Sequence, residues 1–343
     1  MHTGSTFEFG TRSVGEGCPV LVIAEIGINH EGDAGACAEM ISAAAEAGAD
    51  AVKLQTIEPE SNYAPGTISY ELFKRAELTP EETASMFALA RKAGVEPFTT
   101  AGDIRTLEWL RELEPAGYKI SSGLLTCTPV IEFAASLGRP LLMSTGMATV
   151  EDIDAAIGVA RGAKGCDVAL LQCTSVYPAE LHQLNLGSIT WLQHNYDVVT
   201  GFSDHSCGVD AAVHAVSAGA QIVEKHFTLD SSRPEFDHRL SLEPDQFAEM
   251  VSGIRAATLM RGVPGKPLLP EAQTMRRNMS RYLGALRNLR KGDVVGTDTV
   301  GFFRFTPGTE GITAAQFEGL NGRVIKRDVH ASTPLQLEDI DES

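Results

Sequence analysis

Long hydrophobic runs are missing from this sequence. No apolar stretch approaches the roughly 18 residues that a helix needs to cross a bilayer, so the sequence does not indicate a membrane-spanning protein. Residues 1–17, MHTGSTFEFGTRSVGEG, lack the basic start and apolar stretch of a secretory signal, which predicts a cytoplasmic location. The six cysteines contain no C-x-x-C pair, and we expect reduced thiols rather than a disulfide framework.

Positive charge is also scarce. The chain has 28 Lys and Arg residues against 45 Asp and Glu residues, which gives a formal net charge of −17 at pH 7. Nucleic-acid grooves and anionic membrane surfaces are bound through clustered positive charge, so we expect neither kind of partner. An anionic substrate would have to be held by a few locally placed cations.

The sequence does contain a regular alternation of short apolar runs with longer helical patterns between residues 20 and 262. Segments such as PEETASMFALARKAG space their apolar residues three and four apart and end near glycine, as amphipathic helices do. Eight runs of this kind predict eight βα units and therefore a (β/α)8 (TIM) barrel. The expected strands are LVIAEIG (21–27), AVKLQT (51–56), PFTTA (97–101), YKISS (118–122), LLMSTG (141–146), VALLQCT (168–174), VVTGFSD (198–204) and IVEKHFT (222–228).

The length of 343 residues leaves room for smaller parts beside a barrel. The connection from about Ile57 to Thr79 is longer than an ordinary βα loop, and long loops in compact domains tend to be lids or insertions. We expect an N-terminal segment at 1–19, the barrel at 20–262, a linker rich in proline and glycine at 263–280, and a small β-rich domain at 281–343.

Polar side chains gather at one end of every expected strand. The carboxyl ends of barrel strands converge on one mouth, where such folds place their chemistry. A single Ser or Thr there is usually a helix cap, and a lone Lys can reach solvent, but independent capping does not explain charged groups at the same end of five strands. The residues are Glu25, Lys53, Gln55, Thr99, Thr100, Lys119, Ser122, Ser144, Cys173, Thr174, Ser175, Ser203, Asp204, His205 and His226.

Two of these residues, Lys53 and Lys119, are fixed positive charges in an acidic protein. Together with nearby hydroxyl groups they suit a small ligand that carries a phosphate and a carboxylate. The alternative is a set of internal salt bridges, for example Lys53 with Glu25 and Lys225 with Glu224. The available hydroxyl groups belong to Thr100, Ser122, Ser144 and Ser203.

Two histidines, His205 and His226, stand at the ends of adjacent expected strands. With a carboxylate such as Glu25, directly or through water, they suit an octahedral Mn, Co, Fe or Mg site that also binds a substrate oxygen. The alternative is a pair of hydrogen-bonded core histidines. Asp237 and His238 follow in the next loop and either reach the same mouth or belong to a solvated loop.

Strand alternation divides the residues of IVEKHFTL (222–229) between the two sides of the barrel wall. We expect His226 to face the mouth and Glu224 to lie on the same side, one layer below. Lys225 is then expected to face the outer helices.

Motifs over nearly the whole chain, in this order and spacing, resemble the sialic acid synthase family of nonulosonate synthases. The stretches RYLGALRNLRKGDVV, FFRFTPGTEGI and GRVIKRDV resemble that family's C-terminal antifreeze-like (SAF) domain. The motifs of the barrel are VIAEIGINHEGD, AVKLQT, YKISSG, MSTGMAT, LQCTSVYP, GFSDHS, GAQIVEKHFTLD and DHRLSLEP.

The resemblance implies a transferase that condenses phosphoenolpyruvate with an open-chain N-acylated mannosamine-type aldose, or its 6-phosphate, to a nonulosonic 2-keto acid and phosphate. It implies a divalent metal, Mn²⁺ before Mg²⁺ or Co²⁺, held by His205 and His226. It also implies a domain-swapped homodimer in which Arg304 enters the active site of the other subunit. The implied phosphoenolpyruvate-binding residues are Lys53, Thr100, Lys119, Ser122, Ser144, Ser175 and Ser203; the sugar-binding residues are Gln55, Tyr177, Asp237 and Arg304; and the catalytic residues are Glu25, Lys53, Lys119, His205 and His226.

The sequence departs from the family at Leu124, where the family carries an acidic residue that contacts the sugar. An apolar side chain cannot hydrogen-bond a hydroxyl group, so the acceptor is left open among a modified mannosamine, a diacetamido trideoxyhexose, a 6-phosphate and a sugar of specialised metabolism. Two rival functions are a barrel lyase or aldolase that uses Lys119 as a Schiff base, and a non-catalytic protein that binds sugar phosphates.

Overall fold

The computed structural model describes residues 6–163, 166–262 and 265–341. Parts of the expected segments lie outside the described residues, at 1–5, 263–264 and 342–343. The chain divides into two compact units, Met1–Val263 and Pro264–Ser343, and each is described by itself. Among the described residues, no helix is long and apolar enough to cross a membrane.

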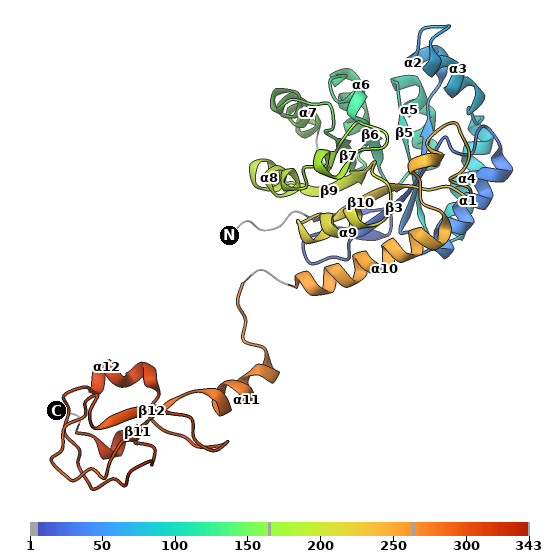
Figure 1. Cartoon of the computed structure of the whole chain (residues 1–343). Coiled ribbons are helices and arrows are strands. Elements are labelled where there is room, and N and C mark those ends of the chain that lie inside the picture. The colour runs from blue at the N-terminus through green and yellow to red at the C-terminus, as the bar shows by residue number, and fades with distance from the viewer. Residues whose placement is uncertain (1–5, 164–165, 263–264, 342–343) are drawn as a thin grey trace. The chain divides into compact units, whose positions relative to one another are not determined.

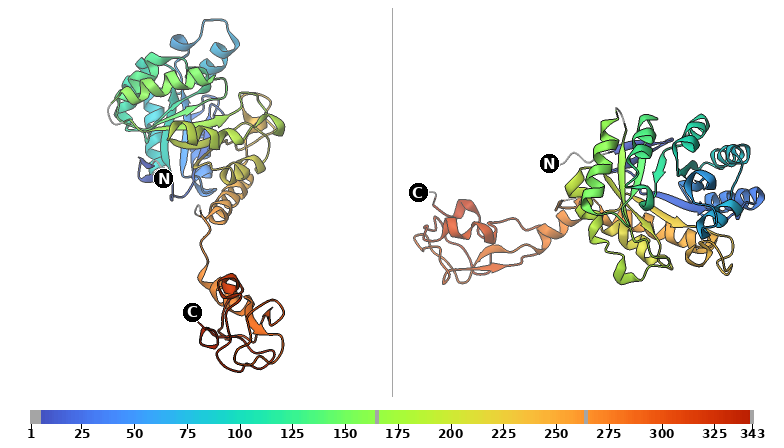
Figure 2. Two further views of the ribbon diagram at one scale, coloured as in Figure 1. Left: turned by 90° about the vertical axis from the view of Figure 1, so that its left-hand side faces the viewer. Right: turned by 90° about the horizontal axis from the view of Figure 1, so that it is seen from above.

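The first unit is a closed barrel of parallel strands with helices on its outside (Figure 1, Figure 2). Each strand pairs with the next along the chain, and β10 pairs back with β3, so the sheet has no free edge. The predicted (β/α)8 fold and all eight expected strands are confirmed, although several strands end one or more residues early. The barrel strands are β3 (Leu21–Gly27), β4 (Ala51–Thr56), β5 (Glu96–Ala101), β6 (Tyr118–Ile120), β7 (Leu141–Ser144), β8 (Val168–Cys173), β9 (Val199–Asp204) and β10 (Ile222–His226).

Four of the barrel helices begin at a side chain that accepts from their first backbone N–H groups, namely Asp33, Thr79, Asp103 and Thr149. Thr79 and Glu82 form a reciprocal capping box at the start of α4, and Thr149 and Asp152 do the same at α7. The helices are α1 (Ala34–Glu46), α4 (Pro80–Lys92), α5 (Ile104–Leu110), α6 (Thr128–Ser136), α7 (Val150–Gly162), α8 (Gly187–Tyr196), α9 (Asp210–Ser217) and α10 (Pro244–Arg261).

Apolar side chains fill the amino-terminal end of the barrel interior. The N-terminal segment forms a hairpin, β1 (Thr6–Phe9) and β2 (Arg12–Gly15), which the sequence did not predict. Its Phe9 ring meets the ring of Phe98 from β5 nearly at right angles, with centroids 5.0 Å apart. The interior core therefore closes the end at which the strands start and leaves the carboxyl ends for polar side chains.

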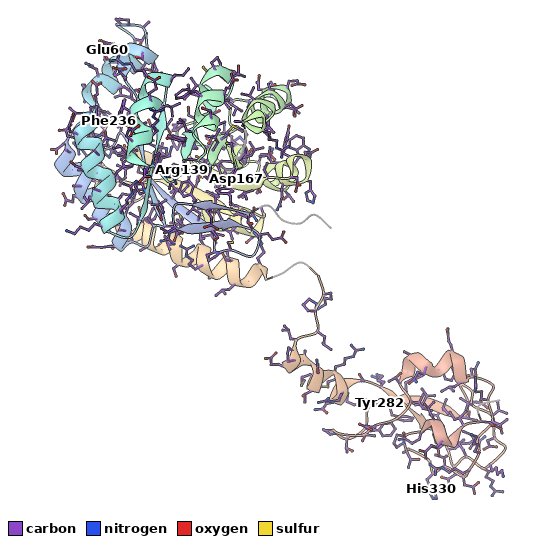
Figure 3. The ribbon with its side chains drawn as sticks, turned by 180° about the vertical axis from the view of Figure 1, so that it is seen from behind. Glu60, Arg139, Asp167, Phe236, Tyr282 and His330 are labelled. Carbon is purple, nitrogen blue, oxygen red and sulfur yellow. The ribbon has the colours of Figure 1, made fainter. Side chains whose placement is uncertain are left out.

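The long connection after β4 forms two short helices, α2 (Pro59–Asn62) and α3 (Ile68–Arg75). At the end of α3, an Arg75 guanidinium nitrogen lies 2.5 Å from the Glu235 carboxylate in the loop after β10. The same guanidinium lies 5.3 Å from the ring centre of Phe236, which is labelled in Figure 3. The predicted lid segment is therefore attached at its far end to the loop that follows the last barrel strand.

The second unit has a small apolar core and little regular structure. Helix α11 (Pro270–Met279) lies within the stretch that we expected to be a linker. Antiparallel strands β11 (Tyr282–Ala285) and β12 (Val300–Phe303) and the short helix α12 (Phe317–Leu320) follow. The core residues are Leu283, Ala285, Leu289, Val295, Val300, Ile312, Ile325, Val329, Leu335 and Ile340.

Candidate active site

A cavity of about 950 Å³, counted with its open mouth, lies at the carboxyl ends of the barrel strands. Twelve of the residues predicted for the site line it, although they come from seven of the eight strands and the loops that follow. Strand closure thus brings together side chains that are far apart in sequence. The twelve residues are Glu25, Lys53, Gln55, Thr100, Lys119, Ser122, Ser144, Tyr177, Ser203, His205, His226 and Asp237.

Two of the predicted site residues do not line this cavity. Ser175 is half-buried, and a Cβ atom placed on Gly146 would come within 2.6 Å both of its hydroxyl and of the sulfur of Cys173, which lines the cavity. Arg304 follows β12 and belongs to the second unit. Ser175 is therefore close to the cavity but is not one of its lining residues.

Glu224 is the centre of the polar floor. Its Oε1 atom accepts a hydrogen bond of 2.8 Å from the Ser203 hydroxyl and lies 3.3 Å from Lys119 Nζ and 3.5 Å from Lys53 Nζ. Burial works against the charge of this carboxylate, but the two lysines outweigh it and hold the pKa of Glu224 at about 2. Glu224 is therefore a fixed negative charge at neutral pH.

Glu25 is a second buried carboxyl group, with the opposite behaviour. Its Oε2 atom lies 3.0 Å from Lys53 Nζ, and its Oε1 atom accepts a hydrogen bond of 2.8 Å from Gln55. Burial nevertheless raises the pKa of Glu25 to about 7, and the negative charge of Glu224 adds to that rise. Two carboxyl groups with divergent pKa values in one cavity are typical of sites that move protons.

The two lysines also differ. Burial favours the neutral form of Lys53, but the carboxylates of Glu224 and Glu25 outweigh it and raise the Lys53 pKa above its ordinary value. Burial lowers the Lys119 pKa, which Glu224 only partly restores. Lys53 is therefore the firmer positive charge of the pair.

The rings of His205 and His226 face the cavity with their centres 5.5 Å apart. His205 Nδ1 lies 2.7 Å from the Thr174 carbonyl oxygen, and since a carbonyl only accepts, this nitrogen carries the proton. His205 Nε2 is left as an acceptor, 3.3 Å from the Tyr177 hydroxyl. Burial lowers the pKa of both histidines, that of His226 strongly, so neutral imidazoles are favoured.

These imidazoles fit two ligands of a divalent metal ion. Among the described residues, His226 Nδ1 is buried without a hydrogen-bond partner, and it lies 3.8 Å from the Asp237 carboxylate, too far for a hydrogen bond. The carbonyl that holds His205 Nδ1 is the kind of outer partner that orients metal-binding histidines. Within the described ranges, no group of three or more His, Cys, Asp or Glu side chains is arranged to hold a metal ion.

One wall of the cavity is apolar, and the sequence did not predict its residues. The side chains of Ile57, Tyr63, Leu72 and Phe73 come from the lid segment, and Ile28 comes from the first βα loop. The rings of Tyr63 and Phe73 stack with their centres 5.2 Å apart. The length of the connection after β4 predicted a lid. Which residues of its two short helices face the cavity depends on how the helices pack, and the sequence does not show that.

Leu124, the departure from the family pattern, does not line the cavity. It ends a short 3₁₀ turn and packs, half-buried, against the apolar cluster between the barrel and its helices. Asn62 of the lid is not a lining residue either, because its amide donates to the Glu58 carbonyl and to the Asp103 carboxylate. Neither position offers a polar group to an acceptor in this cavity.

The outward side of β10 holds a separate ion pair. Lys225 has no exposed surface, and its Nζ lies 2.8 Å from the Asp204 carboxylate, which confirms its predicted outward direction. The alternative pairing of Lys225 with Glu224 is wrong, because adjacent residues of a strand point to opposite sides. The alternative pairing of Lys53 with Glu25 is present, so that buried salt bridge and the cavity coexist.

This chain is similar to known proteins over most of its length. The model of the NeuB family matches residues 40–266. The chain is 32% identical over 350 residues to the N,N'-diacetyllegionaminic acid synthase of Legionella pneumophila, covering 97% of this chain and 98% of that protein. It is 32% identical over 302 residues to the human N-acetylneuraminate-9-phosphate synthase, covering 84% of each. A crystal structure of a sialic acid synthetase from Leptospira borgpetersenii, with citrate bound, superposes with a TM-score of 0.77 at 29% identity, covering 81% of this chain and 98% of that one.

Proposed function

Since this chain belongs to the NeuB family, we propose that it is a transferase that condenses phosphoenolpyruvate with an open-chain N-acylated mannosamine-type aldose, or its 6-phosphate. The products are a nonulosonic 2-keto acid and phosphate. The names of the relatives, which are synthases of legionaminic and neuraminic acids, support this activity. The observation that carries it is the single cavity that joins two lysines, two carboxyl groups of divergent pKa and two neutral imidazoles.

Lys53 and Lys119 are the groups that bind the anionic substrate. Each lies within 3.5 Å of a buried carboxylate, so both are held in place before a ligand arrives. Ammonium groups fixed in this way attract a phosphate and a carboxylate with little loss of side-chain entropy. Hydroxyl donors from neighbouring strands surround them, namely Thr100, Ser144 and Ser203.

The proposed reaction forms one carbon–carbon bond and replaces the carbon–oxygen bond to the phosphate with one to an oxygen atom from water. The methylene carbon of phosphoenolpyruvate attacks the aldehyde carbon of the open-chain sugar, and the aldehyde oxygen takes up a proton. Water then adds to the second carbon of the former phosphoenolpyruvate, and phosphate leaves with its bridging oxygen. Glu25 suits the role of the group that takes the proton from this water, because its pKa of about 7 allows both protonation states near neutral pH.

His205 and His226 would hold a divalent metal ion, with Mn²⁺ proposed before Mg²⁺ or Co²⁺. When bound, such an ion supplies Lewis-acid polarisation of the aldehyde oxygen. The protein keeps both imidazoles neutral by burying them, and it fixes the His205 tautomer through the Thr174 carbonyl. Tyr177 stacks on the His205 ring at 4.3 Å between centres and limits its rotation.

The second unit is proposed to be an SAF-type domain that acts in a domain-swapped homodimer. Arg304 follows β12 of that unit, in the FFRF stretch that resembles the family. In the proposed dimer it would contact the sugar in the active site of the other subunit. An arginine suits this role because its guanidinium donates several hydrogen bonds in one plane.

The acceptor is proposed to place its apolar substituents against the lid. Tyr63 and Phe73 form the stacked part of that wall, and Gln55 and Asp237 provide polar groups beside it. Position 124 carries an apolar leucine, half-buried against the cluster between the barrel and its helices, so no acidic group stands there to bind a sugar hydroxyl. N-acylated and deoxygenated aminosugars fit this mixture better than an unmodified hexose.

Phosphate release tests the activity directly. Purified full-length protein, supplied with Mn²⁺ after treatment with a chelator, should release phosphate from phosphoenolpyruvate only when a suitable aldose is present. The acceptor panel is N-acetylmannosamine, its 6-phosphate and a diacetamido trideoxyhexose. Absence of phosphate release with every member of the panel and every metal would contradict the proposal.

A Schiff-base mechanism is the second candidate, since the lowered pKa of Lys119 is what an imine-forming lysine requires. Borohydride added with a keto acid would then trap a covalent adduct on Lys119, detectable by mass spectrometry. The condensation proposed here forms no imine, so the protein should remain unmodified and active under the same treatment.

A further inference from the structure

The first and last βα loops of the barrel are joined by one buried asparagine. Asn29, which has no exposed surface, donates from Nδ2 to the Phe227 carbonyl and to the Ser241 hydroxyl, each at 3.0 Å. Its Oδ1 atom accepts a hydrogen bond of 3.1 Å from the backbone N–H of Asp237. Residues more than 190 positions apart in sequence are therefore held together by one side chain.

The arrangement requires both a donor and an acceptor on a short side chain. The Phe227 carbonyl can only accept and the Asp237 N–H can only donate, so the orientation of the Asn29 amide is determined by its partners. Ser241 completes the link by donating to the Asp237 carbonyl at 2.7 Å. Both backbone polar groups of Asp237 are thus bonded to this network.

A second anchor holds the residue that follows. His238, also without exposed surface, lies with Nε2 3.0 Å from Glu31 Oε1 and with Nδ1 2.7 Å from the Thr228 hydroxyl. Arg233 lies 2.8 Å from the same Glu31 oxygen. The first βα loop therefore holds the last one at two successive residues, Asp237 through its backbone and His238 through its side chain.

We propose that Asn29 is a positioning residue that sets where the Asp237 carboxylate stands at the cavity rim. The Asp237 side chain lines the cavity, keeps 28% of its surface exposed, and lies 3.8 Å from His226 Nδ1. This inference rests on the proposed function, in which Asp237 contacts the acceptor sugar. A displaced carboxylate would weaken contacts to the acceptor and leave the lysines that bind phosphoenolpyruvate in place.

The split between the two substrates tests the inference. Asn29→Asp keeps the acceptor for the Asp237 N–H but loses the donor to Phe227 and Ser241, and Asn29→Ala loses all three hydrogen bonds. We expect the KM for the aldose to rise about tenfold in Asn29→Ala and less in Asn29→Asp, with the KM for phosphoenolpyruvate within about twofold of the wild type. An unchanged aldose KM, or an equal rise in both KM values, would overturn the inference.

Asn288→Ala is the control outside the barrel, because Asn288, although exposed, accepts the backbone N–H of Ala331 across a loop of the second unit at 2.8 Å. It should leave the KM for phosphoenolpyruvate unchanged and the aldose KM below that of Asn29→Ala. A rise in aldose KM in Asn288→Ala equal to that in Asn29→Ala would show a general effect of destabilisation and overturn the inference.

Hydrogen exchange provides a readout that does not need catalysis. In Asn29→Ala, amide exchange in residues 228–241 should become at least about tenfold faster than in the wild type, while exchange in the strands that carry Lys53 and Lys119 should not change. If Asn29→Ala does not fold, Ser241→Ala removes the donor to the Asp237 carbonyl and one of the two acceptors of the Asn29 amide. It keeps the Asn29 bonds to Phe227 and to the Asp237 N–H, so it should give a smaller change in the same residues. Unchanged exchange in 228–241 would overturn the inference even if the wild type shows no condensation, so the two failures can be told apart.

Discussion

The two sides of β10 hold buried charge in opposite ways. On the outward side, Lys225 Nζ contacts the Asp204 carboxylate and the Ser206 carbonyl, and Asp204 accepts two further hydrogen bonds from Ser206. On the inward side, Glu224 shares one oxygen among three donors, while its Oε2 atom is buried without a hydrogen-bond partner among the described residues. The outward pair is complete, whereas the inward group has bonding capacity left for a ligand.

The difference shows that burial alone does not identify a functional charge. Both groups are at most a few per cent exposed. What separates them is whether every donor and acceptor is already used, because an unpaired buried polar atom costs free energy unless a ligand or water satisfies it. Four measurements test this difference between the two sides of β10.

The largest effect is expected on the outward side. Lys225→Met leaves the Asp204 carboxylate buried without its cation, and we expect a loss of about 3–5 kcal/mol in the free energy of unfolding, measured with urea. Lys74→Met is the matched control, because its partner Glu60 is about half exposed, and it should cost less than about 1 kcal/mol. If Lys225→Met lost no more unfolding free energy than Lys74→Met, the buried pair would be no more important for stability than the exposed one, which would contradict this prediction.

The pH dependence of stability should reveal Glu25. Its folded pKa of about 7 lies above the ordinary value of 4.5, so the folded protein holds this proton more tightly than the unfolded chain. The stabilisation is full below about pH 4.5 and is lost as the pH rises through about 7, which amounts to about 3 kcal/mol. The unfolding free energy should therefore fall between pH 5 and pH 8 by more in the wild type than in Glu25→Gln.

Glu224 is the internal control for that experiment, since its pKa is lowered rather than raised. Its stabilisation is present above about pH 4.5 and is lost as the pH falls through about 2. Glu224 itself should therefore not titrate between pH 5 and pH 8. Loss of its own proton should add nothing to the difference in unfolding free energy between the wild type and Glu224→Gln in that range. A wild-type profile parallel to that of Glu25→Gln would refute the raised Glu25 pKa.

Activity should respond to the inward carboxylate. Glu224→Gln keeps the side-chain shape but removes the charge that orients Lys53 and Lys119, and we expect kcat/KM to fall about 100-fold, or about 2.7 kcal/mol. Because the Glu224 charge helps to raise the Glu25 pKa, the acidic limb of the pH–rate profile should also move to lower pH. An unmoved acidic limb would show that Glu25 does not govern it.

The smallest effects are expected at two serines with matched roles. Ser206 donates to Asp204 at 2.7 Å on the outward side, and Ser203 donates to Glu224 at 2.8 Å on the inward side. Ser206→Ala should cost about 1.5 kcal/mol of stability, since that carboxylate is closed to water. Ser203→Ala should cost less stability but raise the KM for phosphoenolpyruvate about threefold. The reverse pattern in unfolding and kinetic measurements would contradict the comparison.

Much of the barrel could be predicted because its signals are local. Each strand shows a short apolar run, and each following helix shows its own spacing and cap, as at Thr79 and Glu82. The polar strand ends could be placed at one mouth because parallel strands run in one direction. The outward direction of Lys225 followed from alternation alone.

Other features depended on partners that are distant in sequence. The N-terminal hairpin exists because the barrel interior accepts Phe9 beside Phe98, and no local pattern indicates that contact. The apolar wall at Tyr63 and Phe73 depends on how two short helices fold over the mouth. The alternative that pairs Lys225 with Glu224 is wrong, because Lys225 faces outward and meets Asp204 of the neighbouring strand β9.

The barrel, the side of the wall that each strand residue faces and the charged groups at the mouth can be derived from the amino-acid sequence, since they follow from periodicity and chain direction. The protonation of those groups depends on the folded structure. Glu224 and Glu25 have the same side chain, yet the pKa of one is near 2 and that of the other near 7. The physical reason is that burial and the distance to each lysine set the charge of a carboxyl group, and both arise only when the strands close.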